Sequence, residues 1–206
     1  YISTKLTGNF RLLYKDFELL ENQVEEGNVI EPKFFLPIIP TVLLNGSSGI
    51  AVGFATNILN RNPLDLVDSC LKVLDGKKIG KLLPWWRDYN GPVESVAGTN
   101  QYIMRGVYEV LNTTTVNITE LPPSMTFQKY EAHLNSLLDK GTVHSYEDNS
   151  SSGVRYTLKF ARATLSDLIA KGKLDTLLKM VETETENLTC LDERGKLIIF
   201  DNVSNL

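Results

Sequence analysis

The sequence is poor in the residues that build metal centres and disulfide frameworks. Among its 206 residues it has two cysteines, Cys70 and Cys190, and two histidines, His133 and His144. The cysteines lie far apart and outside any C-x-x-C or Cys/His ligand spacing, and neither histidine has a carboxylate or cysteine at ligand spacing. We therefore expect no metal site and no disulfide on this chain, buried free thiols, and histidines without a ligand role.

Long apolar runs are also missing. No stretch approaches the roughly 20 apolar residues of a membrane helix, and no charged segment followed by a short apolar stretch marks export. We expect no membrane partner and a cytoplasmic location. Hydrophobic residues make up 42% of the sequence, which is enough for one sizeable domain, or two small ones, to bury a core.

An excess of basic residues is absent as well, because the formal net charge is -4. By itself this charge argues against a nucleic-acid binder, since Lys and Arg supply the phosphate contacts. The sequence begins with Tyr1 rather than Met. We therefore expect a fragment, whose net charge says little about the parent protein.

Periodicity and turn signals predict an α+β fold with a mainly antiparallel sheet and flanking helices. Apolar residues spaced by three and four, N-caps and closing glycines are the helix signals. They predict helices from just after Tyr1 to Leu20, from Asn62 to Gly76, from Thr126 to Lys140 and from Thr164 to Val181. Alternation and β-branched residues predict strands over 100–112, 114–122, 142–147 and 154–160, and a closing hairpin around Arg194 and Gly195.

Two early segments have no such period. The acidic stretch from Glu21 to Glu31 contains a glycine and predicts a surface loop. In the next segment Pro32, Pro37 and Pro40 exclude a helix interior. They predict an extended path across the core that leads into a Gly/Ser turn.

The stretch LNGSSGIAVGFAT, Leu44–Thr56, raises the functional question. A Gly/Ser loop can cradle phosphate with its backbone N–H groups, but these glycines do not fit G-x-G-x-x-G and no Lys-Ser/Thr follows. A second interpretation is a tight turn packed inside the core. In a third, Ile50 at the tip of a rigid glycine turn enters a DNA base step and kinks the duplex, while Ser47, Ser48 and Gly49 approach the phosphates. The residues alone leave these alternatives open.

The longer segment LPIIPTVLLNGSSGIAVGFATNI, Leu36–Ile58, closely resembles the signature of the breakage-reunion subunits of type IIA DNA topoisomerases. That family includes the gyrase A and topoisomerase IV A subunits and, most similar to this sequence, the medium subunits of T-even-type phages. The identities include Pro40, Asn45, Gly46, Gly49, Ile50 and Gly53. Weaker likeness in ITELPP, GVRYTLKF and DERGKLIIFDNV extends over nearly the whole chain.

The resemblance implies a division into residues 1–33, the C-terminal tail of a winged-helix DNA-cleavage domain, and residues 34–206, a tower domain. Tyr1 and Lys5 match the spacing of the family's catalytic tyrosine and of the basic residue that follows it. By resemblance, Tyr1 is the nucleophile and Ile50 wedges into the gate DNA. Asn45, Gly46, Ser47, Ser48 and Gly49 form the supporting turn, and Lys5 and Arg11 contact phosphates.

The resemblance also implies an activity and its partners. The full enzyme would pass one duplex through a transient double-strand break in another, held by a 5′-phosphotyrosine link. Its partners would be double-stranded DNA, a second copy of the full-length subunit, and another subunit that hydrolyses ATP and binds Mg²⁺ through its carboxylates. We expect the isolated chain to be inactive and, if it is phage-encoded, to act in the host cytoplasm.

The sequence departs from the family just after its signature. Many bacterial relatives have a Pro-Pro-His-Asn run where this chain has LNRNP, Leu59–Pro63, so any role of that histidine cannot be transferred. Two rival functions remain. One is a noncatalytic DNA-bending or scaffold module of the same fold, and the more distant one is a nucleotide-binding α/β domain.

Overall fold

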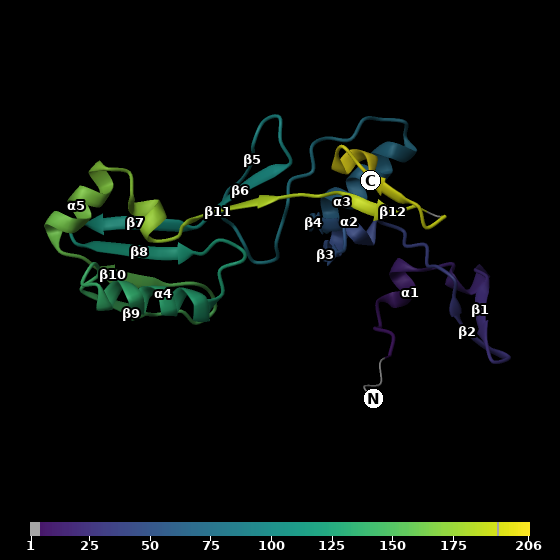
Figure 1. Ribbon diagram of the computed structural model, residues 1–206, viewed down its shortest axis with the longest axis horizontal. Coiled ribbons are helices and arrows are strands. Elements are labelled where there is room, and N and C mark those ends of the chain that lie inside the picture. The colour runs from purple at the N-terminus through teal and green to yellow at the C-terminus, as the bar shows by residue number, and fades with distance from the viewer. Residues whose placement is uncertain (1–4, 193) are drawn as a thin grey trace.

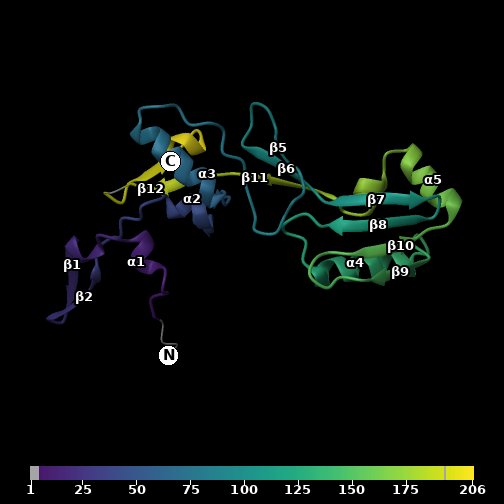
Figure 2. The same cartoon turned by 180° about the vertical axis from the view of Figure 1, so that it is seen from behind.

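The computed structural model describes residues 5–192 and 194–206. The molecule is elongated, with a distal body at one end, a central body, and an N-terminal segment that extends from the central body (Figures 1 and 2). Within the described residues, no helix combines the length and the apolar character needed to cross a membrane.

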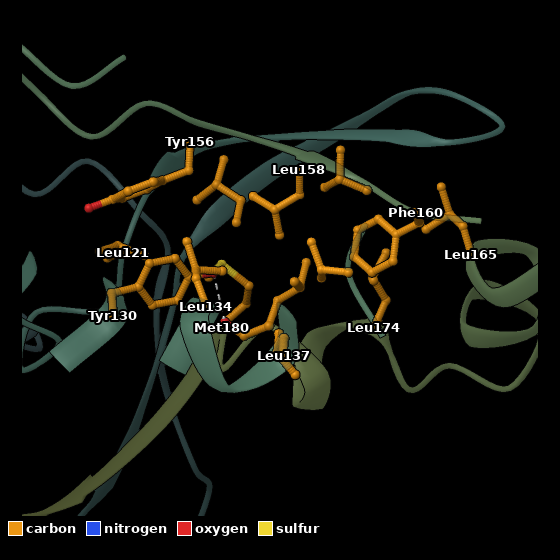
Figure 3. Close-up of a cluster of buried hydrophobic side chains, with 14 residues drawn as sticks. Leu121, Tyr130, Leu134, Leu137, Tyr156, Leu158, Phe160, Leu165, Leu174 and Met180 are labelled. Carbon is orange, nitrogen blue, oxygen red and sulfur yellow. Dashed lines mark hydrogen bonds between the residues drawn. The ribbon is translucent and has the colours of Figure 1, made fainter. Parts of the chain in front are cut away.

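The distal body is a four-stranded antiparallel sheet in the order β7-β8-β10-β9, packed against helices on one face. Its elements are β7 (Val107–Asn112), β8 (Thr115–Glu120), α4 (Phe127–Asp139), β9 (Ser145–Asp148), β10 (Tyr156–Lys159), α5 (Arg162–Ala170) and α6 (Leu174–Leu177). Alternate residues of β8 and β10, such as Ile118 and Tyr156, point into the core. Tyr130, Leu134 and Leu137 of α4 meet them there (Figure 3).

Local signals set the ends of α4 and of the β7–β8 hairpin. The Thr126 hydroxyl accepts a hydrogen bond from Lys129 N at 3.3 Å, so it caps α4. The helix stops before Gly141, which has φ +67°. In the hairpin turn, Asn112 Oδ1 accepts from Thr114 N at 2.9 Å. The predicted helix is therefore confirmed with ends that differ by one residue, and the predicted hairpin turn is confirmed between Asn112 and Thr115.

A three-stranded sheet, β11-β6-β5, connects the distal body to the central body. Its strands are β5 (Val93–Ser95), β6 (Gln101–Arg105) and β11 (Val181–Thr185). The prediction of one strand over 100–112 is wrong, because the chain leaves this sheet at Gly106 and enters the distal one. Gly106 N donates to Met180 O at 2.8 Å, and a Cβ at Gly106 would lie 2.7 Å from Glu120 O. Only glycine fits this crossing.

The helix predicted to reach Val181 is also too long. After α5 the chain turns at Gly172, and α6 ends at Leu177. Lys179 then adopts φ +54°, which a helix interior does not allow. Val181 instead begins β11, which pairs antiparallel with β6 and whose residues alternate between exposed and half-buried. The polar Thr and Glu residues of this strand hid it from hydrophobic periodicity.

The central body packs two helices and two hairpins around Leu43, Ile58, Leu66 and Leu188. Its elements are α2 (Thr41–Asn45), β3 (Ser47–Ala51), β4 (Phe54–Ile58), α3 (Pro63–Leu74), β12 (Thr189–Leu191), β13 (Leu197–Ile199) and the 3₁₀ turn η2 (Val203–Asn205). Asn62 caps α3, as predicted, by accepting from Leu64 N at 2.8 Å. The predicted closing hairpin is confirmed as β12–β13.

The proline-rich segment is extended only in part. Thr41–Asn45 is helical, with Leu43 N donating to Pro40 O at 3.0 Å. The prolines lie before this helix and not within it, so the rule against proline in a helix interior does not apply to it. The short helix places Leu43 in the core, which is the packing role predicted for an extended path.

The N-terminal segment differs most from the prediction. Instead of one helix to Leu20, the described part contains α1 (Phe10–Leu13) and the 3₁₀ turn η1 (Phe17–Leu19). The apolar residues whose spacing predicted a helix pack instead into an aromatic cluster. The ring centroid of Phe10 lies 4.9 Å from that of Tyr14 and 5.8 Å from that of Phe35. Such contacts favour tight turns as readily as a continuous helix.

The predicted acidic loop is a hairpin of β1 (Asn22–Glu25) and β2 (Asn28–Pro32). Its turn residues Glu26 and Gly27 both have positive φ, 49° and 82°, as a two-residue type I′ turn requires. Every residue of β1 is exposed, so no apolar alternation marked the strand. The boundary at residue 33 between a winged-helix tail and a tower domain stays a prediction.

A buried ion pair joins the beginning of α3 to the end of β11. Arg61 Nη2 lies 2.7 Å from Glu186 Oε2, and the two side chains are 0% and 2% exposed. The other carboxylate oxygen accepts from Leu59 N at 2.8 Å. Arg61 also donates to Leu59 O at 2.7 Å and to Leu82 O at 3.0 Å. The pair therefore fixes three chain segments at one point.

We predict that Glu186→Ala lowers the free energy of unfolding by about 3–5 kcal/mol, because it leaves the Arg61 guanidinium buried and unpaired. Denaturant titration of the chain measures the change. The matched control is Glu21→Ala, which removes the partner of Lys33 in an exposed pair and should cost less than about 1 kcal/mol. Equal losses from the two variants would contradict this assignment.

Candidate nucleic-acid interface

The glycine-rich segment forms a two-stranded antiparallel hairpin that projects into solvent. Its register pairs Ser47 with Ile58, Ile50 with Ala55, and Ala51 with Phe54. The turn is Val52–Gly53, with Gly53 at φ +82°. Ser47–Gly49 were predicted to form a turn, and they instead belong to strand β3. Their backbone can hydrogen-bond across to β4, so they follow an extended path.

Ile50 lies on the strand, two residues before the tip, and not at the tip itself. Its side chain is 95% exposed, and Val52 in the turn is fully exposed. The residue opposite Ile50 is Ala55, whose methyl group covers little of a neighbouring side chain. The hairpin therefore presents an isolated branched side chain to solvent, with only small residues around it on β3.

The two central glycines have different reasons to be glycine. Gly46 has φ +68°, and a Cβ there would lie 2.6 Å from Ile58 O and 3.0 Å from Asn60 Oδ1. Its identity is therefore required by the fold. Gly49 has no such φ, and the nearest neighbour of an added Cβ would be Thr56 Cγ2 at 4.0 Å. Glycine within a strand often marks a close approach of another backbone or a ligand.

The remaining residues of the predicted supporting turn are accessible. Asn45 ends α2, and Ser47 and Ser48 begin β3; all three are exposed. In the described part of the chain β3 pairs with β4 alone, so its outer backbone groups are unpaired. Hydroxyl and backbone N–H groups of this kind are the ones that contact DNA phosphates.

The geometry counts against the two alternatives for this segment. A phosphate-binding loop precedes the N-terminus of a helix, where the dipole is positive. Here α2 ends at Asn45, so the segment follows a helix C-terminus and continues as a strand. The packed-turn alternative is wrong as well, because every residue from Ser47 to Ala55 is exposed.

The predicted contacts upstream of the hairpin are only partly described. Tyr1 lies outside the described residues. Lys5 is exposed. Arg11 lies 3.6 Å from Glu18 Oε1 and stacks over the Phe17 ring at 5.9 Å, so its charge is partly engaged within the N-terminal segment. Contacts of Lys5 or Arg11 with phosphate stay a prediction.

The cysteines and histidines offer no metal centre. Cys70 and Cys190 are free and half-buried, less covered than predicted. His133 Nε2 lies 2.7 Å from Leu177 O, and burial lowers the pKa of this histidine. Over residues 5–192 and 194–206 no cluster of three or more His, Cys, Asp or Glu side chains has a geometry that could hold a metal ion.

Sequence reasoning missed the residues that hold the hairpin in place. Asn57 N donates to Asn187 O and Asn187 N donates to Asn57 O, both at 2.9 Å. The Asn57 side chain adds a hydrogen bond to Thr185 O at 2.9 Å. These partners lie some 130 positions apart, and no local pattern signals such a pairing. Gly53, which adopts φ +82°, is the local signal for the turn.

The sequence profile of the DNA gyrase/topoisomerase IV family, which describes the A subunits of these enzymes, matches residues 1–205. The chain belongs to this family. It is 35% identical over 210 residues to the DNA topoisomerase medium subunit of Enterobacteria phage T4, covering 100% of this chain and 47% of that protein. It is 32% identical over 212 residues to the mitochondrial DNA topoisomerase 2 of Dictyostelium discoideum, covering 100% of this chain and 16% of that protein.

A solved structure supports the same assignment. The DNA-binding, cleavage and re-ligation domain of Plasmodium falciparum topoisomerase II matches with a TM-score of 0.88 and 31% identity, over 98% of this chain and 28% of that one. The α+β fold class is therefore confirmed. This topoisomerase chain spans less than half the length of each of these relatives.

The two glycines of the topoisomerase signature should respond differently to a methyl group. We predict that Gly46→Ala lowers the free energy of unfolding by more than about 1 kcal/mol, because it combines a left-handed φ with a backbone clash. Gly49→Ala should change it by less than about 1 kcal/mol. Thermal or denaturant unfolding of the two variants gives the comparison. Similar losses would mean that Gly49, too, is fixed by the fold.

Proposed function

We propose that this chain is part of the DNA-cleaving subunit of an ATP-dependent type II DNA topoisomerase and that it binds and bends the gate DNA segment. The observation that carries the proposal is the 95% exposure of Ile50 on a hairpin of small residues. Isoleucine at such a position gains nothing from the fold of the described chain. The membership of the chain in the topoisomerase family and its similarity to the DNA-binding, cleavage and re-ligation domain of Plasmodium falciparum topoisomerase II supply the DNA context.

Ile50 acts as a wedge between two base pairs. An apolar side chain that enters a base step from the minor groove partly unstacks it and kinks the duplex, at a cost of a few kcal/mol. Burial of the side chain between bases offsets part of this cost. The absence of bulk at Gly49 and Ala51 lets the strand come close to the sugar-phosphate backbone.

The supporting residues position the DNA without reading its sequence. Asn45, Ser47 and Ser48 donate side-chain hydrogen bonds to phosphate oxygens, and the outer backbone edge of β3 adds N–H donors. Lys5 and Arg11 supply positive charge on the approach to the hairpin. These contacts hold the duplex while Ile50 enters it.

Tyr1 carries the covalent step. Its phenolic oxygen attacks a backbone phosphorus, an O–P bond forms, the bond from phosphorus to O3′ breaks, and O3′ takes up a proton. The products are a 5′-phosphotyrosine link and a free 3′-hydroxyl, and the reverse reaction rejoins the strand. A phenol has a pKa of about 10, so its proton must be taken up or offset for attack at neutral pH.

The complete reaction needs other chains. Two copies of the full-length subunit cut the two strands, and a second type of subunit hydrolyses ATP. Carboxylates of that partner bind Mg²⁺, which supplies charge stabilisation at the phosphate. The similarity to a phage T4 protein supports a phage-type enzyme. Such an enzyme would work in the host cytoplasm.

We predict that Ile50→Ala in the intact enzyme weakens DNA bending by about 2 kcal/mol, or roughly thirtyfold, through lost burial of the side chain. Energy transfer between dyes at the two ends of a short duplex measures bending. The melting temperature of the DNA-free enzyme should stay unchanged. Leu74→Ala, which truncates an equally exposed side chain on α3 (83% exposed), is the matched control. Unaltered bending in Ile50→Ala would rule out the wedge.

We predict that Tyr1→Phe abolishes protein-linked DNA while bending persists, because phenylalanine keeps the ring and removes the attacking oxygen. The test incubates the intact enzyme, complete with its ATP-hydrolysing partner, with magnesium and end-labelled DNA, and traps covalent complexes with detergent. Wild-type enzyme that bends DNA but forms no covalent complex would instead identify a noncatalytic bending module.

A further inference from the structure

An apolar groove lies beside the wedge, between the β3–β4 hairpin and the β12–β13 hairpin. Its volume is about 340 Å³, near the lower end of the ~300–1,000 Å³ of small-ligand pockets. One wall comes from the wedge hairpin and the other from the last hairpin of the described chain. The residues that matter below are Ile50, Ala51, Phe54, Cys190, Leu191 and Leu197.

Hydrogen bonds fix the two walls relative to each other. The reciprocal backbone pair of Asn57 and Asn187, both at 2.9 Å, continues the sheet from β4 toward β12. The Asn57 amide reaches Thr185 O at 2.9 Å. Because the walls belong to one hydrogen-bonded unit, the groove exists before any ligand arrives, and little ordering is needed on binding.

The lining selects an apolar ligand. Among the described residues that form it, none is Lys, Arg, Asp or Glu. Its threonine hydroxyls are already committed, since Thr56 Oγ1 donates to Asn187 O at 3.3 Å and Thr189 Oγ1 donates to Asn187 Oδ1 at 2.5 Å. Burial raises the pKa of the Cys190 thiol, which keeps it uncharged at neutral pH. A phosphate would find no counter-charge here, whereas a sugar ring or a base edge needs none.

The groove is continuous with the proposed DNA contact. Ile50 itself lines the groove, and Leu191 on the opposite wall is 69% exposed. The two side chains thus flank one opening. If Ile50 is inserted into a base step of a DNA duplex, the neighbouring nucleotide must lie against this opening, because adjacent nucleotides of a duplex are only a few ångströms apart.

We propose that the groove receives the deoxyribose and base edge of the nucleotide next to the wedged step, with Leu191 as a second apolar DNA contact. This inference rests on the proposed function and names a further part of the same site. The wedge and the groove have different roles. Ile50 separates the bases, and the groove formed with Phe54 and Leu191 holds the displaced sugar in an apolar environment.

The test compares two variants of the intact enzyme, in each of which one leucine-sized side chain of the β12–β13 hairpin is shortened to alanine. Leu191→Ala should reduce the bent fraction about fivefold through lost apolar contact. Ile199→Ala should match the wild type, because Ile199 is equally exposed (67%) but lies outside the groove. Leu191→Met, which restores the volume, should recover most of the bending. Energy transfer between dyes on the duplex ends measures all three variants, with Ile50→Ala in parallel.

The salt dependence separates this contact from a phosphate contact. The slope of log K against log salt should be the same for Leu191→Ala as for the wild type, because no counterion-releasing contact is lost. A reduced slope would overturn the inference by showing that Leu191 supports a phosphate site.

Three further outcomes are decisive. If Ile50→Ala loses bending while Leu191→Ala behaves like Ile199→Ala, the groove proposal fails and the wedge stands. If Ile50→Ala itself keeps full bending, the proposed function fails first. A melting temperature of the DNA-free enzyme that falls in Leu191→Ala but not in Ile199→Ala would show that protein covers the groove, and would also overturn the inference.

Discussion

The buried contact between Arg61 and Glu186 is the constraint on which the arrangement of this chain depends. The chain from α3 to β11, which includes the whole distal body, lies between Arg61 and Glu186 in sequence. The ion pair therefore joins the segment that enters this part of the chain to the segment that leaves it. Arg61 follows directly on the wedge hairpin, and its backbone N donates to Leu43 O at 2.7 Å. The base of the hairpin, the core helix α2 and the returning strand therefore meet at one ion pair. A pair so fully desolvated is tolerated only because each oxygen and nitrogen that faces inward has a partner.

The distal body is held together separately from the central body that carries the hairpin. The distal sheet has its own hydrophobic core, separate from the clusters around Leu66 and around Met104. The described chain enters the distal body at Gly106 and leaves it at Met180. Polar contacts add to these crossings: Tyr108 donates to Asp175 at 2.5 Å, and Ser124 donates to Glu182. The distal body thus folds on its own contacts, while the position of the wedge is decided by the residues that bracket the insertion.

The sequence was sufficient where the relevant signal is local. The caps Asn62 and Thr126 and the Asn112 turn predicted α3, α4 and the β7–β8 hairpin, because each acts on a backbone group within three residues. The first helix failed for a physical reason, since residues spaced by three and four also meet in a folded aromatic cluster. The hairpin at Glu26–Gly27 was missed because every residue of β1 is exposed and only the last part of β2, at Ile30 and Pro32, is covered. Arg61 was noted only as a departure from the family pattern, and its partner lies far along the chain.

The candidate site shows the same difference between local signals, which the sequence contains, and tertiary properties, which it does not. Small residues around Ile50 suggested a wedge, yet composition alone could not distinguish an exposed hairpin from a packed turn, because both need glycine. Exposure is decided by what the rest of the chain covers, and that is a tertiary property. The groove walls are a clearer case. Leu191 and Leu197 look like ordinary core leucines in sequence, and only the pairing of Asn57 with Asn187 places them beside Ile50.

The placement of Ile50 on a strand, rather than at the loop tip, follows from what a wedge must do. A side chain that separates stacked bases is pushed back with a force that its support must resist. A tip residue such as Val52 would transmit this force through two turn dihedrals, which are soft. Ile50 instead transmits it through the β3–β4 ladder to Gly46, which lies against Ile58 O, and through the Asn57 amide to Thr185 O at the end of β11. The ladder consists of backbone hydrogen bonds and the Asn57 side chain adds one bond to Thr185 O, so the hairpin remains stiff at the point where it is loaded. The residues that surround Ile50 on β3 are small, so no neighbouring side chain obstructs the approach of DNA. Their small size does not weaken the β3–β4 ladder, because the ladder is formed by backbone groups and not by side chains.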